Sequence, residues 1–172
     1  MLAANNFWGN SRLFGFAGPP RKVSNMQQYS TTVEIARPLD EMFAFLSRPT
    51  NLARLAPPDF HLELVEGPEV MELGSRLVWK GRRWGIPQKL VQEVTTFVAG
   101  KLIVEEQRKG PFPRWIHAHH FAATAAGTQL REDIQFEPPG GIVGLMINAD
   151  FIRKDLDKMF AFRATKLKEL FG

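Results

Sequence analysis

The sequence predicts an α+β domain in which a curved, seven-stranded antiparallel sheet wraps around a long C-terminal helix. Seven stretches alternate apolar and polar residues, or run apolar between turn residues, as strands do. The connections between the later strands are short and carry glycine or proline, which favours an antiparallel meander. Residues 149–171 carry apolar side chains at helical spacing, and such a stripe needs a sheet to cover it.

One strand and two short helices come before the meander. Residues 29–35 alternate in polarity, as expected for a half-buried strand. Pro38 can open a helix, and Asp40 and Glu41 fall in its first turn, where the helix dipole favours negative charge. A second short helix is expected over residues 51–55, ahead of a pair of prolines. This order of elements is typical of an antiparallel sheet with its helices on one face.

Six strands and a terminal helix make up the rest of the domain. The strands are predicted over residues 60–66, 75–82, 86–97, 101–108, 114–124 and 128–137. After them, an apolar run over residues 142–147 leads into the helix of residues 149–171, with Asn148 as its N-cap. The apolar stripe of this helix is formed by Ile152, Leu156, Met159, Phe160, Leu167 and Leu170. Trp79 and Trp84 fit ordinary sheet packing better than the mouth of a pocket.

The net charge of +4 does not indicate nucleic-acid binding once it is located along the chain. Three of these charges, from Arg12, Arg21 and Lys22, precede residue 26 without any acidic residue, which leaves +1 for the remainder. A nearly neutral domain offers little of the electrostatic footprint that phosphate binding requires, so we expect no nucleic-acid partner. The basic cluster at residues 80–83 is interpreted as a solvated strand edge.

Residues 1–26 are predicted to form a loose extension, because they are rich in Asn, Gly, Pro and Ser and show no sustained period. Their longest apolar stretch is too short for a membrane span, and we expect no integral membrane association. The sequence contains no cysteine, which excludes disulfides and thiolate metal sites. This composition is compatible with the cytoplasmic location that we expect.

Residues 105–121 carry the most specific motif. They read EEQRKGPFPRWIHAHHF, in which Gly-Pro-Phe is followed by Trp-x-His-x-His-x-Phe. This segment resembles a motif of bacterial members of the START-like (SRPBCC) superfamily. The strand, proline and helix at residues 37–45 and the Phe-x-x-Arg of residues 160–163 are similar to flanking parts of the same family. The resemblance implies a helix-grip fold for residues 27–172, like that of the birch pollen allergens, lipid-transfer START domains and polyketide cyclases.

The predicted strand at residues 114–124 places Trp115, His117, His119 and Phe121 on one face, because successive side chains of a strand point to opposite faces. We expect this face to look toward the long helix. Imidazole groups are costly to bury unless they are paired, so we expect hydrogen bonds between these histidines and nearby carboxylates.

Carboxylates of the neighbouring strands fall on the same face. A turn centred between the last two strands sets His119 opposite Glu132, and the preceding turn sets Glu105 beside His117. Both acidic positions usually carry Asp in the family, and Glu keeps the charge while lengthening the reach. Arg163 interrupts the apolar stripe of the helix and could reach the same cluster. The candidate ligand-binding residues are Trp115, His117, His119, Phe121, Gln107, Glu105, Glu132, Phe136 and Arg163.

Three interpretations of this polar band stay open: a structural network, recognition of a polar group on an otherwise apolar ligand, and catalysis. A sheet that curves around one helix leaves a cavity, so the leading hypothesis is a carrier or sensor of a small hydrophobic molecule. A protein-interaction module would instead need an exposed apolar patch.

Catalysis would make the protein a cyclase or dehydratase acting on a polyketide-like or aromatic substrate. The acid-base candidates are His117, His119, Glu132 and Glu105. Two histidines and a carboxylate would also suit a metal ion. Each histidine has a carboxylate neighbour that would satisfy it without one, however, so we expect neither a metal nor a cofactor.

Overall fold

The structure of the protein is a computed structural model that describes residues 25–172. The predicted extension, residues 1–26, lies outside the described residues except for its last two. The elements are β1 (Gln27–Ile35), α1 (Leu39–Leu46), α2 (Pro49–Arg54), the 3₁₀ helix η1 (Pro58–Phe60), β2 (Glu63–Glu66), β3 (Arg76–Arg83), β4 (Ile86–Val98), β5 (Leu102–Lys109), β6 (Arg114–Thr124), β7 (Gly127–Glu137), α3 (Gly141–Met146) and α4 (Ala149–Phe171). Among these helices none is long and apolar enough to cross a membrane.

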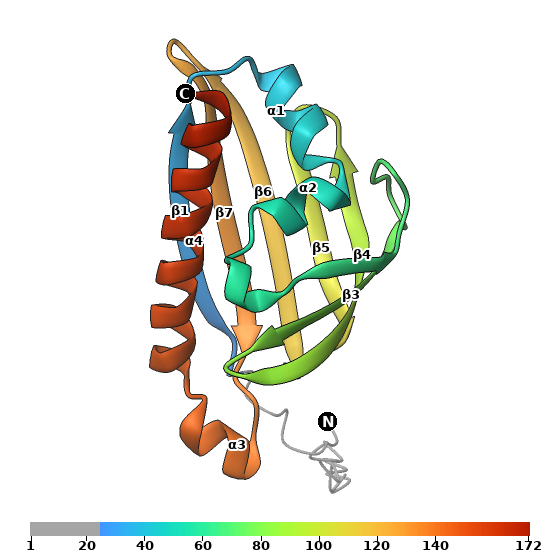
Figure 1. Cartoon of the computed structure of the whole chain (residues 1–172), viewed down its shortest axis with the longest axis vertical. Coiled ribbons are helices and arrows are strands. Elements are labelled where there is room, and N and C mark those ends of the chain that lie inside the picture. The colour runs from blue at the N-terminus through green and yellow to red at the C-terminus, as the bar shows by residue number, and fades with distance from the viewer. Residues whose placement is uncertain (1–24) are drawn as a thin grey trace, which may run out of the picture.

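The seven strands form one antiparallel sheet in the order β1-β7-β6-β5-β4-β3-β2. β1 pairs with β7 from Gln27↔Phe136 to Ile35↔Thr128, so the first strand lies beside the last. Figure 1 shows the sheet curving around α4, which runs along β1 and β7. The helices α1 and α2 cover another part of the sheet. The helix α3 lies at the bottom of the view, at the end of the molecule opposite α1. The predicted α+β helix-grip fold is confirmed.

The two short helices follow the first strand, as predicted. α1 begins directly after Pro38 and carries Asp40 and Glu41 in its first turn. α2 begins at Pro49, two residues before the predicted start, because the fixed φ of proline suits the first position of a helix.

β2 is shorter than predicted, spanning Glu63–Glu66 rather than residues 60–66. The chain first makes the 3₁₀ helix η1 and then passes through His61, whose φ of 42° is left-handed. A strand cannot run through such a residue, so the pairing with β3 starts at Glu63↔Lys80.

α4 spans the predicted residues, and its N-cap is also the predicted one, since Phe151 N–H donates to Asn148 Oδ1 at 2.9 Å. Its buried positions are Ile152, Leu156, Met159, Phe160, Arg163 and Leu167. The apolar run before it does not simply lead into α4 but forms the separate short helix α3, whose large side chains are exposed.

Two clusters of apolar side chains fill the space between the sheet and the helices. One contains Phe121, Leu130 and Leu167, and the other contains residues such as Trp115 and Phe160. His117 and His119 of β6, Glu132 of β7 and Arg163 of α4 are buried polar residues. In each element they lie in the sequence between members of one cluster and members of the other. The fold therefore holds a polar layer between two apolar ones.

Candidate functional site

The polar layer brings together five side chains from three strands and the terminal helix. They are Glu105 of β5, His117 and His119 of β6, Glu132 of β7 and Arg163 of α4, and all five are buried. The register pairs Glu105 with His117 and His119 with Glu132, as the turn lengths predicted. The period of two along β6 is also confirmed, because Trp115, His117, His119 and Phe121 are buried while the residues between them are not.

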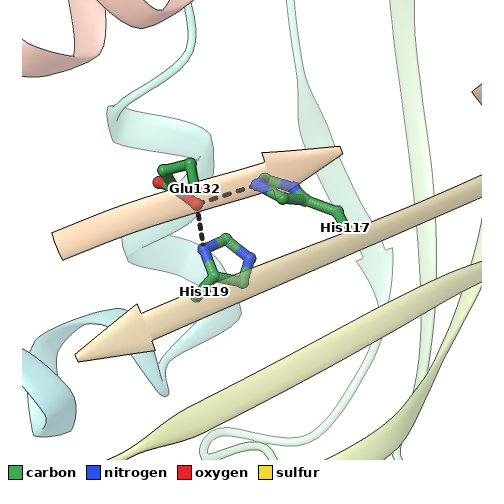
Figure 2. Close-up of side chains that lie close together, drawn as sticks. All are labelled: His117, His119 and Glu132. Atoms are coloured by element: carbon green, nitrogen blue, oxygen red, sulfur yellow. Dashed lines mark hydrogen bonds and ion pairs between the residues drawn. The ribbon is translucent and has the colours of Figure 1, made fainter. Parts of the chain in front are cut away.

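Glu132 is the centre of this layer. His117 Nε2 lies 2.8 Å and His119 Nδ1 2.6 Å from the same carboxylate oxygen, Oε2. Arg163 Nη1 donates to the other oxygen, Oε1, at 2.8 Å. Figure 2 shows the carboxylate reaching from β7 across to the two rings on β6. Both oxygens of Glu132 are thus engaged with nitrogen partners, which is the pairing that burial of a carboxylate requires.

The charges of the layer are fixed by these contacts. Burial alone would raise the pKa of Glu132, but His119, Arg163 and His117 together hold that pKa well below its ordinary value. Burial, reinforced by His119, lowers the pKa of His117 to about 4. Burial would also lower the pKa of His119, but Glu132 and Glu105 outweigh it and raise that pKa. At neutral pH Glu132 is therefore an anion and His117 is neutral, and of the two histidines His119 is the one whose surroundings favour the protonated form.

The hydrogen-bonding state of His117 follows from that of Glu132. An ionised carboxylate only accepts, so the neutral ring of His117 must carry its hydrogen on Nε2 to bond Glu132. The lone pair of His117 then resides on Nδ1. This ring is consequently held by a fixed carboxylate and keeps an unprotonated nitrogen that can accept a hydrogen bond or a proton, as in the recognition of hydroxyl groups and in acid-base catalysis.

Glu105 is the least satisfied member of the layer. Its Oε1 lies 3.8 Å from His119 Nε2, beyond hydrogen-bond distance, and has no hydrogen-bond partner among residues 25–172. Burial raises the pKa of its carboxyl, although His119 and Arg163 act in the other direction. Glu105 is thus a buried carboxyl group with capacity for a further hydrogen bond.

A cavity of about 130 Å³ opens beside the polar layer. Six of the predicted ligand-binding residues line it: Glu105, Gln107, Trp115, His117, His119 and Arg163. The other three lie behind its wall. Phe121 packs edge-on against Phe43 with ring centroids 5.1 Å apart, Phe136 packs behind Trp115 at 5.9 Å, and Glu132 is covered by its own partners.

Several lining residues escaped the sequence reasoning. They come from α2, the chain around η1, β3 and the β5–β6 turn: Leu52, Ala56, Phe60, Leu62, Trp79, Arg83 and Phe112. Trp79 is almost fully buried, and its Nε1 has no hydrogen-bond partner among residues 25–172. The interpretation of Trp79 as an ordinary sheet residue was therefore incomplete, since it packs in the core and also lines the cavity. An inward tryptophan two residues before a glycine in the same strand was the signal that could have indicated this.

Arg83 does not belong to a solvated strand edge, as the cluster at residues 80–83 was interpreted. The pairing of β2 with β3 extends only over Val78–Lys80, but Arg83 forms an ion pair with Asp155 of α4 in which both side chains are less than one fifth exposed. Its guanidinium lies 5.1 Å from the centre of the Phe60 ring and 6.0 Å from that of Trp115. The interpretation was wrong for Arg83 because sequence spacing does not reveal the partner on α4.

The three residues His117, His119 and Glu132 also offer ligand atoms within 4.8 Å of one another. This donor set suits several divalent metals. Arg163, however, holds the same carboxylate at 2.8 Å and would place a fixed positive charge next to the ion. Glu132 already lies 2.8 Å from His117 Nε2 and 2.6 Å from His119 Nδ1 without a metal, and the absence of a bound metal stays a prediction.

Comparisons with known proteins place the chain in a family. Residues 26–172 match the family described as polyketide cyclase/dehydrase and lipid transport. A search of curated proteins finds no match. Similar solved structures include a protein from Chromobacterium violaceum, with 15% identity, a TM-score of 0.65 and coverage of 84% of this chain and 97% of that one.

Two further structures resemble this one. Major latex-like protein 151 from Panax ginseng has 12% identity and a TM-score of 0.65, covering 86% of this chain and 98% of that one. The Zhui aromatase/cyclase from a Streptomyces species has 17% identity and a TM-score of 0.64, covering 84% and 92%. At these identities the likeness shows a shared fold. Because the family match extends over nearly all described residues, the protein belongs to the polyketide cyclase/dehydrase and lipid transport family of the START-like superfamily.

Proposed function

We propose that the protein binds a small apolar molecule with one oxygen-bearing end in this cavity, as a carrier or sensor. The observation that carries the proposal is a group of buried polar atoms that have no hydrogen-bond partner among residues 25–172, among them Trp79 Nε1, Glu105 Oε1 and Arg163 Nε. All three side chains line the cavity. Each such atom costs about 1–3 kcal/mol when it is left unpaired, so three in one cavity favour a site completed by a ligand.

The size of the cavity limits the ligand. Its volume of about 130 Å³ is close to that of an engineered protein cavity of about 150 Å³ that holds benzene. The ligand that fits is therefore of about the size of one six-membered ring, or a short branched chain. Trp79, Trp115 and Phe112 supply aromatic walls for such a molecule.

The polar end of the cavity determines the orientation of the ligand. Trp79 and Arg163 present N–H donors, and Glu105 adds a third donor whenever its carboxyl is protonated, which its raised pKa favours. An oxygen that accepts hydrogen bonds, such as a carbonyl or phenolic oxygen, would meet these groups. A carboxylate would meet the same donors but would also lie close to the charge of Glu132.

A titration with a panel of small molecules tests this proposal. Phenols, quinones, aromatic polyketides, fatty acids and sterols are each added to the purified protein, and the melting temperature is recorded. We expect a stabilising shift with the phenols or quinones. Replacing Ala56, which lines the cavity, by tryptophan should abolish the shift, whereas Ala122→Trp on the exposed face should leave it unchanged. A flat response across the whole panel would contradict the proposal.

The role of the polar end is tested by comparing matched ligands. A phenol should bind more tightly than the corresponding toluene, because only the phenol supplies the missing hydrogen-bond partners. Trp79→Phe keeps an aromatic wall but removes the N–H, so it should weaken the phenol by roughly fivefold and leave the toluene unchanged. Equal losses for both ligands would show that the indole N–H does not contact the oxygen.

A second candidate function is acid-base catalysis by a cyclase or dehydratase. The observation that favours it is the neutral His117, which lines the cavity, bonds Glu132 through Nε2 and keeps an unprotonated Nδ1. Wild-type protein would be incubated with aromatic and polyketide-like substrates and the products followed by mass spectrometry. His117→Ala and His119→Ala should abolish turnover with the circular dichroism spectrum retained. Survival of every substrate in the presence of wild type would remove the support for an enzyme.

A further inference from the structure

The short helix α3 exposes an unusual amount of apolar surface. Ile142 is 82%, Leu145 81%, Met146 77% and Val143 54% exposed. Exposed single apolar residues are common on proteins, but a contiguous group of this kind indicates an interaction surface. It is also the kind of surface that a protein-interaction module would require.

The apolar surface continues onto neighbouring elements. Ile86, in the β3–β4 hairpin, and Phe151, in the first turn of α4, are also largely exposed. A shallow groove connects the hairpin with α3, with Ile86 and Pro87 on one side and Val143 and Ile147 on the other. We call this surface, formed by Ile86, Ile142, Val143, Leu145, Met146 and Phe151, the α3 patch.

The hairpin beside the α3 patch is basic. Its strands carry the exposed residues Lys80, Arg82 and Lys89, and no acidic residue occurs between Arg76 and Gln92. Lys80 faces Lys89 in the register of β3 and β4 and Glu63 in that of β2 and β3, and Lys89 lines the shallow groove itself. The positive charge of Lys89 and the apolar side chains of the groove therefore adjoin.

The acidic residues of α4 near this end do not cancel that charge. Asp155 is paired with Arg83, and Asp150 lies one helical turn before the exposed Lys154. A surface that combines exposed large apolar groups with adjacent basic residues is complementary to a layer of anionic lipid headgroups over acyl chains.

The shape of α3 also favours a lipid layer over a protein groove. Residues 142, 143, 145 and 146 spread over about 160° of the circumference of a helix with 3.6 residues per turn. A groove on a partner protein would take a narrower stripe of anchors, one turn apart. A fluid apolar medium accepts side chains over the whole arc.

The α3 patch lies next to the cavity. Gln88 and Pro111 line both the shallow groove and the cavity of the polar layer. The cavity and the shallow groove therefore share part of one wall. We propose that the α3 patch and the basic β3–β4 hairpin form a docking surface for the anionic surface of a lipid bilayer. This inference goes beyond ligand binding, because the residues of the α3 patch do not line the cavity.

Vesicle sedimentation tests the docking surface on the full chain. The protein is mixed with vesicles of phosphatidylcholine containing phosphatidylserine, or of phosphatidylcholine alone, and the pelleted fraction is measured. We expect binding to the anionic vesicles that weakens with added salt. The variant Leu145→Ser/Met146→Ser should weaken it by roughly tenfold or more, since both side chains would otherwise leave water. The control Leu73→Ser changes a side chain that is 68% exposed near the α1 end and should have no effect.

The contribution of charge is tested in the same assay. Lys80→Gln and Lys89→Gln should each weaken binding by about fivefold, the effect of one basic residue near an anionic surface. Lys101→Gln, in the β4–β5 turn, is the matched control. Equal binding of wild type and the apolar double variant would overturn the proposal, as would equal losses in the controls.

Other occupants of the α3 patch give distinct outcomes. If a second copy of the chain covers it, ultracentrifugation without lipid will show a dimer that Leu145→Ser/Met146→Ser dissociates, and wild type will not pellet with vesicles; this result would overturn the proposal. Failure of the docking surface is distinguishable from failure of the cavity. The ligand titration should be unchanged in the double variant, and Ala56→Trp should still bind vesicles.

Discussion

Replacing Glu132 by glutamine should be strongly destabilising, although the two side chains have the same shape. The carboxylate is 2% exposed and meets His117, His119 and Arg163 at 2.6–2.8 Å. The neutral amide leaves the guanidinium of Arg163 buried without the counter-charge of Glu132. Removing one partner of a buried ion pair costs about 3–5 kcal/mol, which for a chain of this size corresponds to a melting temperature lowered by about 6–20 °C.

Urea denaturation followed by circular dichroism measures this loss. Glu66→Gln is the control, because the ion pair between Glu66 and Arg76 is more than half exposed on both sides and should contribute less than about 1 kcal/mol. Combining Glu132→Gln with Arg163→Met should cost less than the sum of the single changes, since the second change removes the charge that the first left unpaired. A Glu132→Gln protein within about 1 kcal/mol of wild type would refute the reasoning.

Two further predictions concern the pH dependence and a turn. The folded-state pKa of His117 is about 4 and the unfolded value about 6.5, so between these values the unfolded chain binds the proton that the folded chain excludes. Stability should therefore fall as pH is lowered from about 6.5 to about 4, by at most about 3 kcal/mol, and His117→Gln should flatten this slope in urea denaturation; a slope unchanged by the substitution would contradict it. Gly127→Ala should destabilise the β6–β7 turn by about 1–3 kcal/mol, because Gly127 has φ 141° and a Cβ would lie 2.2 Å from the carbonyl oxygen of Ile35, whereas Gly140→Ala, with open space around it, should be nearly neutral; equal melting temperatures for the two variants would count against this account.

The sheet and the polar layer were predictable because each depends on local rules. A period of two sends His117 and His119 to the same face, and a tight turn between β6 and β7 then leaves one register, which sets His119 opposite Glu132. Arg163 was recognisable as the charged residue that interrupts an apolar helical stripe. These residues lie in long, regular elements, in which side-chain direction follows from position.

The remaining features depend on how elements approach one another. Leu52, Ala56 and Leu62 line the cavity because α2 and the chain around η1 fold over the sheet, and no spacing in the sequence indicates that approach. The ion pair between Arg83 and Asp155 joins residues 72 positions apart. The exposure of α3 was missed for another physical reason, since an apolar run is normally expected to be buried and only the structure shows that no described element covers it.

A crystal structure of the protein with a phenolic ligand selected by the titration would test the proposed function most directly. We predict that the ring lies between Trp79 and Trp115 and that its oxygen lies within hydrogen-bond distance of Trp79 Nε1, Glu105 Oε1 or Arg163 Nε. A ligand bound outside the cavity, or one whose oxygen points away from these three groups, would contradict it.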